Sequence, residues 1–267
     1  MQLVGFPVVA GIVLLAFVAN AKKSAHEKLN NPIRMASFAF SLVLFVYATA
    51  MFFNSFADMT TDGVAFNNYT FHDSYEWFPA LGIHWTVGLD ALSFPMVWLT
   101  TFLLPVTIIA TWHEKNGATY FPTLLLMGGA LIGVFVSLDL FMFYVFWELT
   151  LIPMFFLILN WGGKDRKYAS QKFFIYTFTA SVVMLLGLVT LYLMQPDQIG
   201  TGGKYGTMTG RTFDIPTLVE SATMANQEGW FMGESMQKVL FVMLMLGFLV
   251  KLPAVPFHTW LPDAHVQ

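Results

Sequence analysis

Seven long apolar stretches constrain this chain more than any other feature of its sequence. Each is about as long as a helix that crosses the hydrocarbon core of a bilayer, which takes roughly 20 residues. They run Gln2 to Asn20, Ile33 to Phe53, Ala91 to Trp112, Thr119 to Val136, Leu140 to Asn160, Phe173 to Met194, and from Lys238 through Lys251 towards Trp260. Only 11% of the residues are charged, against about a quarter in soluble domains. We therefore predict an all-α, polytopic membrane helix bundle with about seven transmembrane helices.

The basic residues between these stretches alternate from one connection to the next. Lys22, Lys23 and Lys28 lie between the first and second stretches, whereas residues 54–89 contain no Lys or Arg. Basic residues gather again between the fifth and sixth stretches, as Lys164, Arg166, Lys167 and Lys172. Connections rich in Lys and Arg stay in the cytoplasm, which predicts an N-terminus outside. A cleaved signal peptide is not expected, because no basic segment precedes the first stretch.

The chain lacks the residues and motifs that hold most cofactors. It contains no Cys, which excludes disulfides, Fe–S clusters and thiolate metal sites held by this chain. The glycine-rich nucleotide motifs and the His-Glu-x-x-His zinc motif are absent as well. The net charge of −3 gives no reason to expect a nucleic-acid partner. We predict that this chain itself binds no cofactor.

Two charged residues fall near the middle of predicted membrane spans. Glu148 lies in the fifth stretch and Lys251 in the seventh. A charge at the bilayer centre costs about 3 kcal/mol on insertion scales, so each must face protein or water. Pro153 follows Glu148, and Pro253 and Pro256 follow Lys251. Because proline has no N–H, each removes the helical partner of a backbone carbonyl, and broken helices at mid-membrane often build ion sites.

An acid and an amine in one wet cavity can form a proton relay. Burial disfavours the charged form of each group and an opposite charge favours it, so the two would titrate as a coupled pair. We predict that Glu148 and Lys251 form such a relay and that His258 extends it. The alternatives are a static ion pair and a histidine that only packs. Trp147 and Trp260 suit packing or anchoring at the membrane interface.

Other polar features have structural readings. Asp90 and Asp139 each precede an apolar stretch and are predicted to cap a helix. Residues Phe213 to Met224 suit either a short amphipathic element along the membrane or a solvated loop. Gly129 and Gly133 form a G-x-x-x-G pattern that indicates close helix packing.

Three segments resemble the antiporter-like subunits of respiratory complex I. Residues 139–148, DLFMFYVFWE, followed by LTLIPMF, resemble the fifth-helix signature of that family. Residues 250–265, VKLPAVPFHTWLPDAH, resemble its broken seventh helix and the turn after it, and DALSFP at residues 90–95 resembles the start of its third. The LIPM and PDAHVQ versions of these motifs point to the chain M (subunit 4) branch. The resemblance covers roughly residues 90–267.

The resemblance implies an inverted-repeat fold truncated after its first half. Residues 1–89 would hold two helices and an extracytoplasmic loop, and residues 90–267 an incomplete proton-translocating membrane domain. Glu148 matches the essential membrane glutamate of the family and Lys251 the lysine of its broken helix. The missing second repeat suggests a fragmentary gene, with a split subunit as the alternative, and the chain as given is not expected to pump alone.

The resemblance also implies a function within a larger enzyme. The chain would be the proton-translocating membrane subunit of an NADH-quinone oxidoreductase in a prokaryotic plasma membrane. NAD(P)H or another donor, FMN, Fe–S clusters and quinone are expected on partner subunits, and chains L and N among its neighbours in the bilayer. A subunit of a Na⁺/H⁺ antiporter or of a membrane-bound hydrogenase is the alternative function. A purely structural scaffold is the third.

Overall fold

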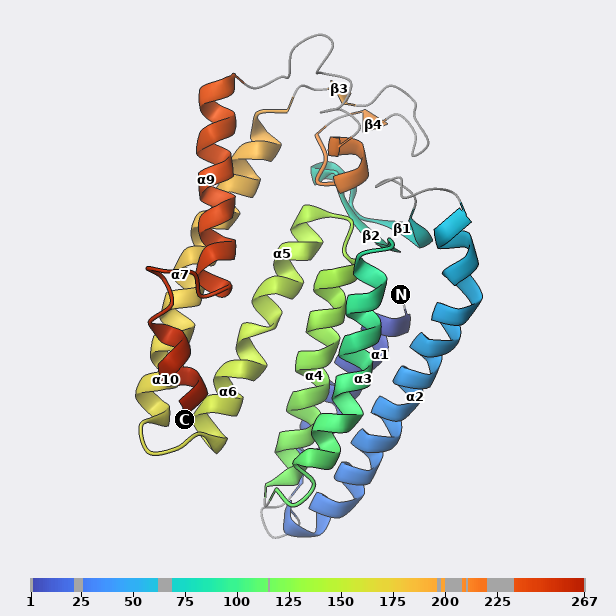
Figure 1. Ribbon diagram of the computed structural model, residues 1–267, viewed down its shortest axis with the longest axis vertical. Helices are drawn as coiled ribbons and strands as arrows, with labels where there is room; N and C mark the ends of the chain where they lie inside the picture. Colours follow the sequence, from blue (N-terminus) through green and yellow to red (C-terminus); the bar gives the residue numbers. More distant parts are fainter. Residues whose placement is uncertain are drawn as a thin grey trace. The chain divides into compact units, whose positions relative to one another are not determined.

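The computed structural model describes residues 2–21, 26–61, 69–114, 116–195, 198–199, 208–209, 211–219 and 233–266. Helices dominate the described residues (Figure 1). Their bounds are α1 Gln2–Asn20, α2 His26–Thr61, α3 Ser93–Ala110, α4 Gly117–Val136, α5 Leu140–Leu149, α6 Leu151–Trp161, α7 Arg166–Leu193, α9 Glu234–Lys251 and α10 Trp260–Val266. The strands are β1 Thr70–Phe78, β2 Ile83–Leu89, β3 Gln198–Ile199 and β4 Met208–Thr209.

Each of the seven apolar stretches contains a helix, although the seventh leaves the helical conformation after Lys251. Five helical segments within the described residues are long and apolar enough to cross a membrane: Lys28–Asn54, Ser93–Ala110, Gly117–Val136, Leu140–Trp161 and Arg166–Leu193. The apolar segment Gly5–Asn20 is shorter. Helix α9 occupies the seventh stretch and carries Glu234, Lys238 and Lys251 along its 18 residues. The predicted all-α membrane bundle is therefore confirmed, with a count of seven as an approximation.

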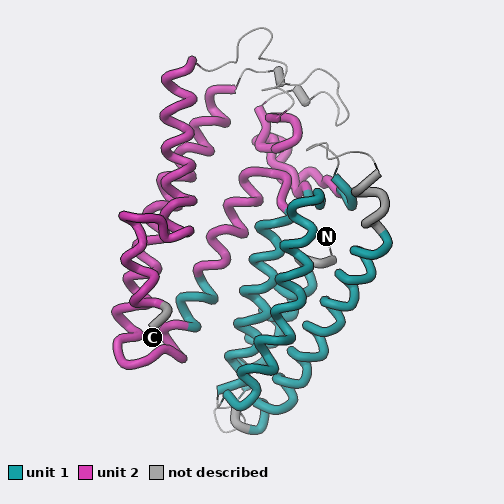
Figure 2. Tube along the Cα trace, viewed as in Figure 1, with its two compact units in different colours: residues 1–72, 87–136, 152–157 teal, residues 73–86, 137–151, 158–267 magenta. Residues whose placement is uncertain are grey.

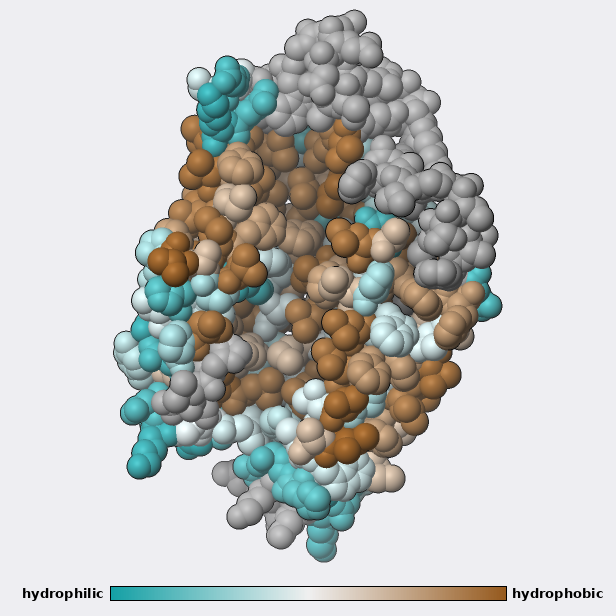
Figure 3. All heavy atoms as spheres, viewed as in Figure 1, coloured by the Kyte–Doolittle hydropathy of each residue, from teal (hydrophilic) through white to brown (hydrophobic). Residues whose placement is uncertain are grey.

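The helices turn apolar side chains outward. Val43 on α2 is 68% exposed and Phe241 on α9 is 61% exposed. In the space-filling view, hydrophilic residues gather at the N-terminal end of α9 while its flank is largely apolar (Figure 3). Apolar side chains on an outward helix face are suited to lipid rather than to water. The exposed surface thus agrees with membrane helices.

The chain divides into two compact units, which are coloured separately in Figure 2. Unit 1 consists of Met1–His72, Val87–Val136 and Ile152–Leu157. Unit 2 consists of Asp73–Thr86, Ser137–Leu151 and Ile158–Gln267. Glu148, Lys251 and His258 all belong to unit 2, so the candidate site can be described within one unit.

Unit 1 packs helices α1 to α4 against one another. Ile108, Phe121 and Leu124 form a fully buried cluster between α3 and α4. Helices α1 and α4 approach closely because Gly11 and Gly129 have no side chain at their contact. A Cβ on Gly129 would lie 2.7 Å from Val8 Cγ2, so the close packing predicted from the G-x-x-x-G pattern is present.

Replacing Gly11 with alanine is expected to destabilise unit 1 by about 1–3 kcal/mol, as overpacking does. The added Cβ would lie 2.9 Å from the carbonyl oxygen of Pro122 and 3.0 Å from the backbone nitrogen of Leu126, neither of which can rotate away. Gly5→Ala in the same helix is the matched control, because its Cβ meets nothing within 4 Å. Thermal unfolding in detergent compares the two. Equal stability of the two variants would contradict the close contact.

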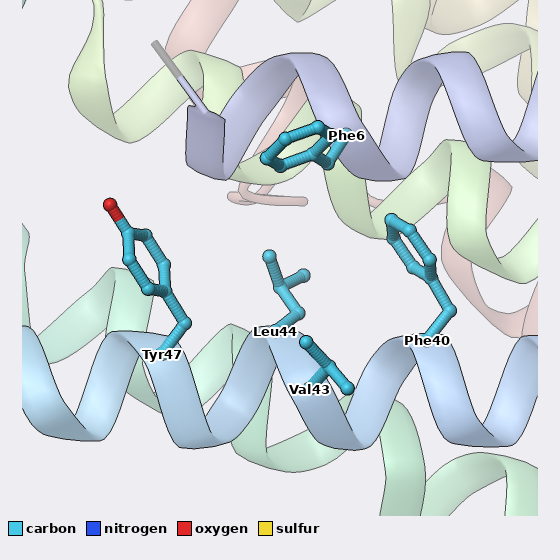
Figure 4. Close-up of a pocket in the computed structure, with 5 residues that line it drawn as sticks. All are labelled: Phe6, Phe40, Val43, Leu44 and Tyr47. Atoms are coloured by element: carbon cyan, nitrogen blue, oxygen red, sulfur yellow. The ribbon is translucent and has the colours of Figure 1, made fainter.

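An apolar pocket lies between α1 and α2 in unit 1. Figure 4 shows the rings of Phe40 and Tyr47 rising from α2 on either side of Leu44, towards Phe6 of α1. Val43 completes the lining. Its walls are apolar and aromatic, so its chemistry matches that of the surrounding helix faces.

Unit 2 packs α7 against α9 and α10, and α5 against α7. A Cβ on Gly247 of α9 would lie 2.8 Å from Met184 Cβ of α7, so the two helices run in close contact.

The start of α5 is fixed by Asp139, whose Oδ1 accepts from Phe141 N at 2.9 Å and Met142 N at 3.1 Å. Burial raises the pKa of the Asp139 carboxyl, while hydrogen bonds from backbone N–H groups act in the opposite direction. The predicted helix cap is therefore present.

Asp90 also caps a helix, although this helix begins two residues later in the chain than predicted. Its Oδ1 accepts from Leu92 N at 3.0 Å and Ser93 N at 2.6 Å, and Ser93 Oγ accepts from Asp90 N at 3.0 Å. This reciprocal pair resembles a capping box. Helix α3 therefore begins at Ser93 rather than at Ala91.

Two features of the connections were not predicted. Strands β1 and β2 pair in a two-stranded sheet within what we expected to be a plain loop. The described part of Phe213 to Met224 begins with buried Phe213 and Asp214 and continues as a short helical segment at residues 215–219, whose last residue, Val219, is 42% exposed. Phe213 stacks on Tyr192 at 4.5 Å, and Asp214 forms a β-bridge with Asp139. Residues 220–224 lie outside the described residues.

Candidate functional site

The fifth apolar stretch breaks next to Glu148. Helix α5 ends at Leu149, Thr150 forms a turn, and α6 begins at Leu151. Pro153 explains the break, since it has no N–H to donate to the carbonyl of Leu149. The sequence therefore correctly predicted a weakened helix beside this glutamate.

The seventh stretch breaks at Lys251, the last residue of α9. Pro253 cannot donate to the carbonyl of Leu249, and Ala254 N donates to it instead at 2.9 Å. The carbonyl of Val250 accepts from the indole Nε1 of Trp260 at 2.8 Å. Trp260, at the start of α10, is thus a partner of the broken helix end and not only a packing residue.

Lys251 is held by the last turn of α5. Its Nζ donates to the carbonyl oxygen of Trp147 at 2.9 Å and to Thr150 Oγ1 at 2.7 Å. The same Nζ lies 4.1 Å from the centroid of the Trp147 ring, within the range of a cation–π interaction. The two helix breaks therefore meet at this lysine.

Glu148 lies near Lys251 without pairing with it directly. The two groups interact electrostatically, and within the described part of the chain no direct ion pair joins them. The hydroxyls of Tyr144 and Ser181 interact with the carboxylate. Its Oε1 is buried and has no hydrogen-bond partner among the residues that the structure describes. The arrangement supplies an acid and an amine that can respond to each other's charge.

His258 lies in the turn between α9 and α10. Its Nδ1 is buried without a hydrogen-bond partner among residues whose placement is described, and no hydrogen bond links it to Glu148 or Lys251 there. Helix α10, which follows this turn, is bound to α7 by an ion pair: Lys172 Nζ of α7 lies 2.5 Å from Asp263 Oδ2 of α10. His258 therefore follows Lys251 in the turn after the helix break. It takes no part in the two hydrogen bonds of Lys251.

Sequence reasoning missed three residues of this site. Tyr144 lies four residues before Glu148, a spacing that places both on one helix face. Thr150 lies three residues before Pro153, where the break was expected, and its hydroxyl could have been considered there. Ser181 is contributed by α7, and no local pattern marks it.

Comparison with known proteins places the membrane domain in a family. Residues 137–267 match the family described as "NADH:quinone oxidoreductase/Mrp antiporter, TM". The chain is 44% identical over 188 residues to NADH-quinone oxidoreductase subunit M of Rhodobacter capsulatus. The chain belongs to this antiporter-like family. It spans 35% of the length of that relative, and the match covers 70% of the present chain.

Other relatives agree with the assignment. F(420)H(2) dehydrogenase subunit M of Methanosarcina mazei is 42% identical over 199 residues, covering 74% of this chain and 37% of that protein. A structure of respiratory complex I from Thermus thermophilus with bound NADH matches 99% of this chain and 46% of the solved chain, with a TM-score of 0.73 and 25% identity. The Mrp complex from Dietzia sp. shares the fold, with a TM-score of 0.65 at 16% identity over 99% of this chain and 25% of that one.

Proposed function

We propose that this family member is a proton-translocating membrane subunit of a complex that transfers electrons to quinone. The observation that carries the proposal is the meeting of two helix breaks at Lys251, with Glu148 beside it. In this mechanism a charge displacement in a neighbouring subunit changes the charge on Glu148. Lys251 then gains or releases a proton, and His258 extends the path.

Unsatisfied polar atoms support a hydrated path through the site. Buried polar atoms nearly always have a hydrogen-bond partner, in the protein or in ordered water. Glu148 Oε1 and His258 Nδ1 are buried and have no protein partner within the described residues. Water is a suitable partner for both, and a chain of water would carry protons between groups that do not touch.

The available energies are of the right size for such a relay. Moving one charge across 100 mV takes about 2.3 kcal/mol. A single hydrogen bond to a charged group contributes about 1.5–3 kcal/mol to a buried site. Making or breaking one contact of Lys251 is therefore enough to drive a proton step against the potential.

The redox chemistry is proposed to lie on partner subunits. The relatives are named for different donors, F420H2 in one and NADH in another, so the donor is set by other chains of each complex. We propose that FMN, Fe–S clusters and quinone are bound by partners, and that chains L and N are neighbours of this one. The predicted prokaryotic plasma membrane with an external N-terminus belongs to the same proposal.

A Na⁺/H⁺ antiporter subunit is the second candidate function, because the family description and the fold both extend to the Mrp complex. Proton flux into vesicles that contain the whole complex separates the two. We expect flux that requires an electron donor and quinone and does not require sodium. Flux that depends on a sodium gradient and continues without quinone would support the antiporter and contradict redox-driven pumping.

A further inference from the structure

Among the residues that the structure describes, the hydrogen bonds and the ring contact of Lys251 come from neutral groups on a single turn. We propose that Trp147 and Thr150 are positioning residues that form a cradle for the charged form of Lys251. The cradle consists of the carbonyl oxygen and indole ring of Trp147 and the hydroxyl of Thr150. This inference rests on the proposed proton relay and names the groups that control it.

The cradle offers acceptors and a ring face to Lys251, and both interactions are stronger with an ammonium group than with a neutral amine. Thr150 Oγ1 donates its one proton to the carbonyl oxygen of Trp147 at 2.7 Å. It therefore has only lone pairs to offer Lys251 Nζ at 2.7 Å. The Trp147 carbonyl is likewise an acceptor, and the ring face attracts cations. An uncharged amine still has two N–H groups to donate to these two acceptors, but its hydrogen bonds would be weaker than those of a charged donor, and it would lose the cation–π contact.

The helix break makes this cradle available. The last carbonyls of a helix have no partner within the helix itself, and α5 ends at Leu149. Trp147 therefore lies in the final turn, where its carbonyl can accept from a side chain of another helix. The indole ring is fixed there by an edge contact with Phe248 of α9 at 5.3 Å. Helices α5 and α9 thus contact each other in two ways: Lys251 of α9 donates to Trp147 and Thr150, and Phe248 of α9 packs on the Trp147 ring.

Within the described ranges, the other charged or titratable groups near the broken helix are Glu148, Tyr144, His258, Lys172 and Asp263, and no hydrogen bond joins any of them to Lys251. On α5, Glu148 interacts with Lys251 electrostatically and Tyr144 interacts with Glu148. On α7 and α10, Lys172 and Asp263 pair with each other. Because the cradle is neutral, Lys251 can hold a proton without a direct ion pair. The carboxylate of Glu148, which is not held in a direct ion pair with Lys251, can then respond to a neighbouring subunit.

Replacing Thr150 with valine tests the cradle in the assembled complex. Valine keeps the branched shape but removes the acceptor, so the ammonium form becomes less favourable. We expect the alkaline limb of the pumping-against-pH profile to shift by about one pH unit towards lower pH, the size of one lost hydrogen bond to a charge. Thr150→Ser should restore the profile, because serine retains the hydroxyl.

A matched control removes a buried threonine hydroxyl elsewhere in the same unit. Thr177 Oγ1 donates to the carbonyl of Phe173 at 2.7 Å within α7, and Thr177→Val should leave the profile unchanged. If Thr150→Val does not assemble, Trp147→Leu should shift the limb in the same direction and Trp147→Phe should shift it less. An unshifted limb in the assembled Thr150→Val complex, or in Trp147→Leu where that is the variant tested, would overturn the cradle.

The Lys251→Arg variant separates the cradle from the proposed function. If Lys251→Arg stops pumping while the cradle variant keeps the normal profile, the relay stands and the cradle is wrong. If Lys251→Arg pumps normally, the proposed relay itself is wrong, whatever the Thr150 variants do.

Discussion

Proton pumping by the assembled complex is expected to fall by about tenfold or more when Glu148 is replaced with glutamine. Glutamine has nearly the same size but cannot carry a charge or a transferable proton. Breaking a buried charge interaction by removing one partner typically changes the energy of the site by about 3–5 kcal/mol, whereas about 1.4 kcal/mol already corresponds to a tenfold rate. Donor-driven acidification of vesicles, measured at equal complex content, checks this result.

Two control variants sharpen the test of Glu148. Glu148→Asp keeps a titratable carboxyl and should retain part of the pumping. Glu234→Gln removes an acid whose side chain is 82% exposed at the end of α9, and it should leave pumping intact. Normal pumping by Glu148→Gln, with the complex fully assembled, would remove this residue from the mechanism.

Lys251→Arg is expected to abolish pumping while the complex still assembles. Arginine keeps the positive charge but does not release its proton in proteins, so it can satisfy a static charge and cannot carry a proton through a cycle. The guanidinium can still donate to the acceptors of Trp147 and Thr150, which favours assembly. Pumping and assembly are measured on the same preparation, by vesicle acidification and by the yield of intact complex.

The same variant decides between a relay and a structural ion pair. A purely structural lysine would tolerate arginine, and a scaffold would tolerate it as well, so normal pumping by Lys251→Arg would contradict proton transfer at this position. Lys238→Arg is the matched control on the same helix, because the Lys238 side chain is 73% exposed and pairs with Glu234 one turn away. It should pump like the unaltered protein.

The helices and their breaks were largely predictable from the sequence. Membrane spans follow from the length of apolar stretches, and the first predicted stretch coincides with α1. The breaks beside Glu148 and Lys251 follow from Pro153 and Pro253, because a missing N–H is a local property of the chain. The charged residues Glu148 and Lys251 were also visible in the sequence, because each interrupts an apolar stretch.

Long-range partners were not predictable from local patterns. The sequence indicated which carbonyls would lose their helical partners but not which groups would contact the broken ends. The indole of Trp260 reaches Val250 and the amine of Lys251 reaches Trp147 only after the helices have packed. Strands β1 and β2 were missed because they are nine and seven residues long, far shorter than the apolar run that marks a membrane span.

The central claim is that Glu148 and Lys251 change protonation during turnover, and infrared difference spectroscopy of the working complex tests it most directly. We predict a carboxylic C=O band that appears or disappears with donor addition, is lost in Glu148→Gln, and is altered in Lys251→Arg. A spectrum in which turnover produces the same carboxylic bands in all three proteins would contradict the account.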